Sequence, residues 1–261
     1  MSKGLLDPKV DFVFKNIFGS PNHPEILISF LNATLKAKKK IVNVDIKKTD
    51  IEKQYIEDKY SRLDVKATTS NDEIINIEIQ LKNENNMVKR SLYYLSKMYE
   101  EQLNEKEDYS KLVRTVCINI LNFKYLKTDN FHTGYRFKEI ESNEELTDIM
   151  EVHFIEIPKL QDSSDEKDML VAWTEFLKDP ESEKVRGLEL SIEEIRQAKD
   201  ELIRMSNDST QRELYDMRAN SLRDKMSELN AAERKGIEKG REEGREEGRK
   251  EEKIKIARNM K

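Results

Sequence analysis

Hydrophobic and polar residues alternate in two short runs between positions 61 and 82, and this stretch predicts two β-strands joined by a polar turn. The apolar face of the pair is expected to carry Leu63, Val65 and Ala67 from the first strand and Ile75, Ile77, Ile79 and Leu81 from the second. Residues 69–72 have the composition of a turn. If the hairpin folds about Asn71, paired positions sum to 142, and Asp64 lies opposite Glu78.

The opposite face of this hairpin carries the candidate chemistry. Directly opposed residues have Cβ atoms about 4.5–5.5 Å apart, so Asp64 and Glu78 would repel each other unless a cation lies between them. A hard divalent cation such as Mg²⁺ prefers such oxygen ligands. Gln80 and Lys82 continue the same polar face, because side chains two residues apart in a strand point the same way. The alternative is that Asp64 and Glu78 are solvent-facing residues of an amphipathic hairpin.

An amphipathic helix is predicted before the hairpin, starting at Asp7 and Pro8 and ending at Gly19. Its apolar stripe consists of Val10, Val13, Phe14, Ile17 and Phe18. Asp11 lies beside this stripe, where it could lean toward the hairpin as a third acidic group. The alternative is an exposed pair with Lys15, four residues away.

Another helix is predicted over residues 87–103, after the hairpin. Its buried stripe is expected to be Val88, Leu92, Leu95, Tyr99 and Leu103. Basic and aromatic residues lie on the adjoining faces, and four of them are candidate nucleic-acid contacts: Lys89, Arg90, Tyr93 and Lys97. The alternative is that the tyrosines belong partly to the core.

The rest of the chain predicts further strands and then helices. Strands are expected over 41–55, 113–121, 135–140 and 152–157, and helices dominate from residue 165 onward. Glycines recur every four residues at 236, 240, 244 and 248, in a segment with equal numbers of acidic and basic residues. Because each glycine costs about 1 kcal/mol of helix stability relative to alanine, we expect a marginal, solvated helix or a disordered tail. The alternative is a self-association segment.

Composition limits the classes of function. The 261 residues have a formal net charge of −5, so a nucleic-acid interface would have to be a local patch. The single cysteine, Cys117, cannot form an internal disulfide, and the three histidines show no zinc-ligand spacing. No run approaches the ~20 apolar residues of a membrane span, and the N-terminus has no apolar signal segment. We therefore expect a cytoplasmic, soluble protein without a membrane partner.

Several segments together resemble a known family. They are DFVFKNIFG (11–19), RLDV (62–65), IEIQ (77–80), CINILNF (117–123) and the C-terminal EKGREEGREEGR. With Asp64 followed after thirteen residues by Glu78, this set resembles the recombination-promoting nuclease and transposase family of the PD-(D/E)XK nuclease superfamily. The resemblance implies an α/β fold, with a restriction-endonuclease-like core whose mixed central sheet is flanked by helices. We expect the core over residues 1–160, a packed helical extension over 161–206 and a long polar helix with the glycine-repeat tail over 207–261.

The resemblance also implies an activity: Mg²⁺-dependent hydrolysis of DNA phosphodiester bonds by an endonuclease, with Mn²⁺ as an alternative ion, linked to recombination or mobile elements. Asp64, Glu78 and Asp11 would be the metal-binding residues. Gln80 would hold the attacking water or the phosphate, with Lys82 as a reserve cation. The sequence departs from the superfamily at Leu63, where a proline is common, and at Gln80, where lysine is usual; glutamine orients water but supplies no charge. The competing hypothesis is an inactive nuclease fold that binds or assembles, as a homo-oligomer, through its C-terminal helices.

Overall fold

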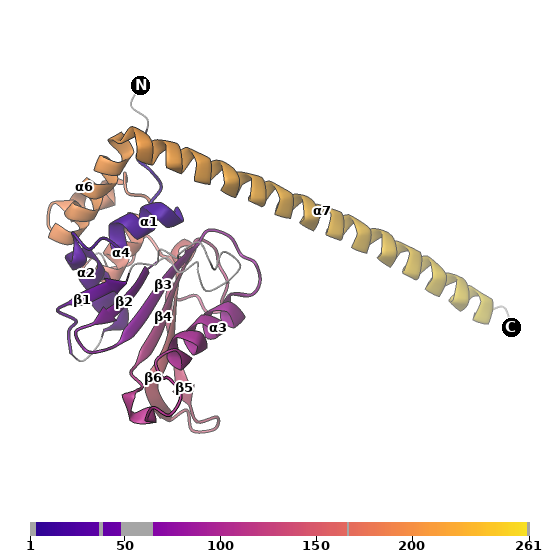
Figure 1. The fold of residues 1–261 in the computed structure, drawn as a ribbon. Helices are drawn as coiled ribbons and strands as arrows, with labels where there is room; N and C mark the ends of the chain where they lie inside the picture. Colours follow the sequence, from indigo (N-terminus) through magenta and orange to yellow (C-terminus); the bar gives the residue numbers. More distant parts are fainter. Residues whose placement is uncertain (1–3, 37–38, 48–64, 166, 260–261) are drawn as a thin grey trace. The chain divides into compact units, whose positions relative to one another are not determined.

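The computed structural model describes residues 4–36, 39–47, 65–165 and 167–259. Within them a six-stranded mixed sheet has the strand order β1-β2-β3-β4-β6-β5 (Figure 1). The strands are β1 (Val44–Lys47), β2 (Val65–Thr69), β3 (Ile74–Gln80), β4 (Thr115–Leu121), β5 (His132–Lys138) and β6 (Glu145–Glu156). The central strands β3, β4 and β6 are mutually parallel, and the outer pairs are antiparallel. The structure is therefore α/β and agrees with the restriction-endonuclease-like fold expected from the sequence.

Helices cover both faces of the sheet. They are α1 (Asp11–Phe18), α2 (Pro24–Leu35), α3 (Met87–Glu100), α4 (Met169–Lys178), α5 (Glu183–Glu189), α6 (Glu193–Asn207) and α7 (Ser209–Asn259), with short 3₁₀ turns η3 (Tyr109–Lys111) and η4 (Ile157–Lys159). The larger core lies between the sheet and the layer formed by α1, α2, α4, α5 and α6, with Trp173 fully buried within it. A smaller core lies between α3 and the other face. The sheet is thus enclosed on both sides around its central strands.

The predicted register of the hairpin is confirmed. Val65 pairs with Ile77, Lys66 with Asn76, Ala67 with Ile75 and Thr68 with Ile74, and each pair sums to 142. The turn closes with the Asp72 amide donating to the Thr69 carbonyl at 3.0 Å, and Asp72 takes a left-handed conformation with φ of 61°. Asp64, the first residue of the predicted acidic pair, lies outside the described residues, as does most of the strand predicted over 41–55.

The first helix begins later than the sequence indicated. Asp7 and Pro8 form a turn, in which the Asp7 carboxylate accepts a hydrogen bond from the Lys9 amide at 2.9 Å, and α1 begins at Asp11. Because the carboxylate caps this turn, it does not cap the helix. The predicted stripe and the end at Gly19 are confirmed: all five stripe residues are buried in the larger core.

Helix α3 presents a different side to the sheet from the one predicted, and this is a correction. Val88 and Leu92 are 41% and 48% exposed, whereas Leu95 of the predicted stripe is buried. The other buried residues of the helix are Met87, Ser91, Tyr94 and Met98. The physical reason is the sheet face beneath it, which carries the buried polar side chains Asn76, Glu78 and Asn119. These need polar partners, and only the Arg90 and Ser91 side of the helix supplies them.

The chain divides into two units, residues 1–215 and 216–261. The second unit consists of the helical residues that follow Tyr215 in α7. Space for a Cβ atom is open at all four glycines of the repeat, and Lys239 lies 3.7 Å from Glu243 one turn away. The segment is thus a solvated helix, one of the two states expected. None of the described helices has a stretch apolar and long enough to cross a membrane.

Candidate functional site

Glu78 is a carboxylate buried at the centre of the molecule. It lies in β3 on the face covered by α3, and its side chain is only 1% exposed. The Arg90 Nε atom, from α3, donates to Glu78 Oε2 at 3.1 Å. The Asn76 amide, two residues earlier in β3, donates to Glu78 Oε1 at 3.5 Å. A buried charge is costly unless it is paired, so Arg90 is what allows Glu78 to remain ionised in this position.

Burial nevertheless dominates the electrostatics of Glu78. Loss of hydration raises the pKa of the carboxyl above its ordinary value of 4.5, against the opposing charge of Arg90 and hydrogen bonds from Asn76 and Gln80. For Arg90, burial also works against the charge, but the Glu78 carboxylate outweighs it and raises the pKa of the guanidinium. Burial therefore disfavours the charged form of Glu78, and a cation bound to the carboxylate would stabilise that form.

Two polar atoms on or near this strand are buried and lack a partner in the described part of the chain. One is Asn76 Oδ1, and the other is the Lys82 ammonium nitrogen, just past the end of β3. A buried donor or acceptor without a partner costs about 1–3 kcal/mol. An amide oxygen of this kind suits a cation or water, and an unpaired ammonium suits an anion such as a phosphate.

The surroundings of Glu78 contain further buried polar groups. Asn119 of β4 lies beside Glu78 in the parallel register, and its Oδ1 is 2.8 Å from the Ser91 hydroxyl of α3. Cys117 lies 3.8 Å from the Asn76 amide nitrogen. Burial, followed by the charge of Glu78, raises the pKa of the Cys117 thiol to about 12. This thiol therefore stays protonated at neutral pH in the metal-free protein.

The other predicted site residues are distributed over the helices. Asp11 is the first residue of α1, in the layer on the other face of the sheet, and its Oδ1 accepts a hydrogen bond from the Phe12 amide at 2.7 Å.

On α3, Lys89 is exposed and Tyr93 is 52% exposed. Lys97 lies 3.3 Å from Glu100 and 3.7 Å from Glu101, so acidic neighbours already offset its charge. The structure brings Glu78, Gln80 and Arg90 together, and the roles proposed for all of these residues remain predictions.

The donor atoms near Glu78 fit a hard divalent cation in part. They are oxygens from the Glu78 carboxylate and the Asn76 and Gln80 amides, the ligand type that Mg²⁺ and Mn²⁺ prefer. No group of three or more His, Cys, Asp and Glu side chains placed to hold a metal ion occurs in the described ranges, and Asp64 falls outside them. A complete site would thus need at least one further ligand.

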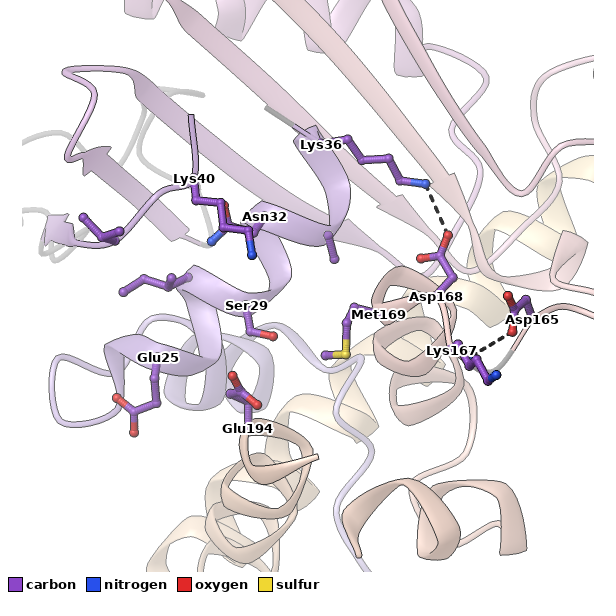
Figure 2. A pocket seen from close by; sticks show the side chains of 13 residues that line it. Glu25, Ser29, Asn32, Lys36, Lys40, Asp165, Lys167, Asp168, Met169 and Glu194 are labelled. Carbon is purple, nitrogen blue, oxygen red and sulfur yellow. Dashed lines mark hydrogen bonds and ion pairs between the residues drawn. The ribbon is translucent and has the colours of Figure 1, made fainter. Parts of the chain in front are cut away.

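A pocket of about 770 Å³ lies on the other side of the sheet from Glu78, between α2, the segment before α4, and α6 (Figure 2). Its lining has lysines at positions 36, 40 and 167 and carboxylates at positions 25, 165, 168 and 194. Lys36 lies 3.2 Å from Asp168, as the dashed line in Figure 2 shows. With its charges mixed and partly paired, this pocket has no field that selects a phosphate, and we do not assign the candidate chemistry to it.

A second buried polar network crosses the sheet from the start of β3 and β4 to the middle of β6. Arg114 makes ion pairs with both Glu73 and Glu151, which are 8% and 5% exposed. His153 Nε2 is 2.7 Å from Glu151, and His153 Nδ1 is 2.9 Å from His132 Nε2. Burial and then the neighbouring His153 lower the pKa of His132 to about 4. The histidines that are distant in sequence are therefore brought together by the pairing of β5 with β6, which the sequence did not reveal.

The chain matches the model of a known protein family. The model of the family described as PD-(D/E)XK nuclease family transposase matches residues 8–232 of the chain. Searches of curated proteins and of solved structures found no match. The matched region includes Asp64, Glu78, Gln80 and the whole of α3.

Proposed function

Because the chain belongs to the PD-(D/E)XK nuclease family transposases, we propose that it hydrolyses phosphodiester bonds of DNA with a divalent metal ion, in recombination or mobile-element activity. The family implies a nuclease-type, phosphodiester-hydrolysing activity. The choice of DNA, of endonucleolytic cleavage, and of Mg²⁺ with Mn²⁺ as the alternative, is our proposal.

The single observation that carries the proposal is the environment of Glu78. A carboxylate 1% exposed, on a strand whose neighbouring Asn76 Oδ1 and Lys82 Nζ lack partners among the described residues, is a costly arrangement with no structural benefit. Polar groups left in this state are typical of a site that binds ions and charged substrate. The pairing of Val65 with Ile77 supports the proposal that Asp64, one residue earlier in the sequence, is the metal-binding partner of Glu78.

Most of the candidate residues then have a defined task. Glu78 and Asp64 would hold the metal ion. Asp11 begins α1 in the layer on the other face of the sheet from Glu78 and has no task in this proposal. Gln80 would orient the attacking water or the scissile phosphate, and Lys82 would offset charge developing on that phosphate. A divalent cation bound there would supply Lewis-acid chemistry, lowering the pKa of water and offsetting phosphate charge. Lys89, Tyr93 and Lys97 of α3 would contact the nucleic acid beyond the site.

The test is cleavage of a supercoiled plasmid with and without Mg²⁺ or Mn²⁺. We expect the wild type to cleave only with metal and Asp64→Ala to be inactive while keeping its circular dichroism spectrum. Asp129→Ala is the matched control, because Asp129 is exposed in the segment before β5. Metal-independent cleavage, or equal rates for Asp64→Ala and wild type, would contradict the proposal.

Gln80 offers a second, quantitative prediction. If its amide orients water or phosphate, Gln80→Ala should lower the single-turnover rate by about 10²–10³-fold, as removal of one oriented donor does in other active sites. Gln80→Lys should retain activity or increase it, because an ammonium adds electrostatic stabilisation. Lys82→Ala, measured in parallel, distinguishes the Lys82 ammonium from the one that Gln80→Lys introduces. If Lys82 already supplies the charge, Lys82→Ala should lower the rate, and Gln80→Lys should also lower it by crowding the site. Equal rates for Gln80→Ala and wild type would remove Gln80 from the mechanism.

The second candidate function is assembly through the C-terminal helices by an inactive nuclease fold. The observation in its favour is α7, whose residues from Arg234 to Lys250 are exposed along the whole segment. A protein that fails to cleave in the plasmid assay, and falls from oligomer to monomer in light scattering when truncated after Asn230, would support this function instead.

A further inference from the structure

Arg90 links the buried carboxylate of Glu78 to the surface of the protein. Its side chain is 24% exposed, whereas Glu78 is 1% exposed. Of the five donors in its guanidinium group, the Nε donor is used on Glu78 at 3.1 Å. Arg90 therefore spans the boundary between the interior and the solvent at the candidate site.

The two terminal nitrogens of Arg90 are unused. In the described part of the chain, no acceptor hydrogen-bonds either of them, and neither is among the buried side-chain atoms that lack a partner. Both nitrogens are thus accessible from outside. A guanidinium with two free terminal nitrogens has the fork geometry that binds a phosphate through two parallel hydrogen bonds.

An aromatic ring fixes the guanidinium without using these donors. The Arg90 Cζ atom lies 5.0 Å from the centre of the Tyr94 ring, one turn along α3, and Tyr94 is itself only 2% exposed. A cation–π contact of this kind orients the plane of the guanidinium and leaves its edge open. Of the other two basic residues of α3, Lys89 is exposed, and the charge of Lys97 is offset by Glu100 and Glu101.

We propose that Arg90 is a positioning residue with two tasks: its Nε holds the Glu78 carboxylate in the metal-free protein, and its terminal nitrogens bind a backbone phosphate of the nucleic acid. This inference rests on the proposed function and assigns a residue for phosphate recognition at that site. The first task also makes Arg90 a competitor of the metal ion for Glu78. Removal of Arg90 should therefore have opposite effects on the two ligands, with tighter binding of metal and weaker binding of nucleic acid.

The test measures both affinities without turnover. Mn²⁺ binding is followed by electron paramagnetic resonance at pH 8, and binding of a labelled DNA duplex is followed by anisotropy in EDTA over a series of salt concentrations. For Arg90→Met we expect Mn²⁺ affinity to rise about tenfold, because the positive charge that pairs with Glu78 at 3.1 Å is removed. The slope of log K against log salt concentration should fall by about one, the signature of one lost phosphate contact. Arg90→Lys keeps the charge but not the fork geometry, so its Mn²⁺ affinity and its salt slope should lie between those of wild type and Arg90→Met.

Controls keep the outcome interpretable. Arg186→Met removes an exposed arginine from α5, in the layer on the other face of the sheet, and should change neither affinity. If Arg90→Met does not fold, Glu78→Gln with Arg90→Met leaves no unpaired buried charge, and its salt slope is compared with that of Glu78→Gln alone. If the ion pair between Arg90 and Glu78 is purely structural, Arg90→Met should weaken the binding of both ligands or of neither. Either result would overturn the inference.

Failure of the proposed function is distinguishable from failure of this inference. A wild type that binds Mn²⁺ and DNA but cleaves nothing rejects hydrolysis, and the two affinities still decide the role of Arg90. A wild type that binds neither ligand rejects both.

Discussion

Replacing Glu78 by glutamine is expected to abolish cleavage and to raise the melting temperature of the metal-free protein. The loss of activity follows from removing a metal ligand, whose charge stabilisation is worth several kcal/mol, or about 10³-fold or more in rate. The gain in stability follows from burial, which makes the ionised Glu78 costly despite its pair with Arg90. A catalytic residue that destabilises the fold gives this combination, whereas a structural residue gives the opposite change in melting temperature.

The stability difference should depend on pH in a defined direction. The pKa of Glu78 in the folded protein is raised above the ordinary value of 4.5. In the pH window between 4.5 and this raised pKa, the folded protein binds a proton that the unfolded chain has released. Stability of the wild type therefore falls as pH rises through the window. The difference in stability between Glu78→Gln and wild type should be absent below pH 4.5, increase as pH rises, and stay constant above the raised pKa. Added Mg²⁺ should stabilise the wild type and leave the variant unchanged.

Thermal melts from pH 4 to 8 with and without Mg²⁺ test this expectation. Glu141→Gln is the control, because Glu141 is exposed in the turn between β5 and β6 and should show neither effect. A large drop in melting temperature for Glu78→Gln at pH 8 would mean that the ion pair with Arg90 is structural and that Glu78 is not held for a ligand.

The hairpin could be predicted from sequence because its information is local. Four apolar residues at period two from Ile75 onward, with a turn composition before them, allow one register in which both apolar faces meet, and a slip of one residue would bury the polar set. The same reasoning identified Glu78 and Gln80 as neighbours on one face. It did not reveal that this face is itself covered, because nothing in the strand shows which helix packs over it.

The orientation of α3 could not be predicted for the same reason. Its hydrophobic residues are spread around the helix, so periodicity alone favoured the side of Val88 and Leu92. The structure buries the side with Arg90 and Ser91, since Glu78 and Asn119 opposite them require partners. A usable signal was present: β3 and β4 contain Asn76 and Asn119 within otherwise apolar runs, which indicates a buried face that needs polar contacts from elsewhere.

Replacing Arg114 by methionine is expected to cost about 3 kcal/mol of stability. Arg114 is 15% exposed and is the cation between Glu73 and Glu151, and removing one partner of a buried ion pair typically costs ~3–5 kcal/mol. We expect the lower end of this range, because Arg136 and His153 still contact Glu151. Arg114→Lys should recover only part of the loss, since a single ammonium cannot bridge two carboxylates as the guanidinium fork does.

The cost should shrink in acid. Burial works against the charge of Glu151, but His153, Arg114 and Arg136 outweigh it and lower its pKa to about 2. A carboxylate whose pKa is lowered by folding stabilises the folded state at pH values above its unfolded-state pKa of 4.5. This contribution is lost as pH falls toward 2. Urea denaturation at pH 7 and pH 3 should therefore show a larger difference between wild type and Arg114→Met at pH 7. With Arg186→Met as the exposed control, a loss below 1 kcal/mol at pH 7, or one equal at both pH values, would show that the network adds little to the stability of the sheet.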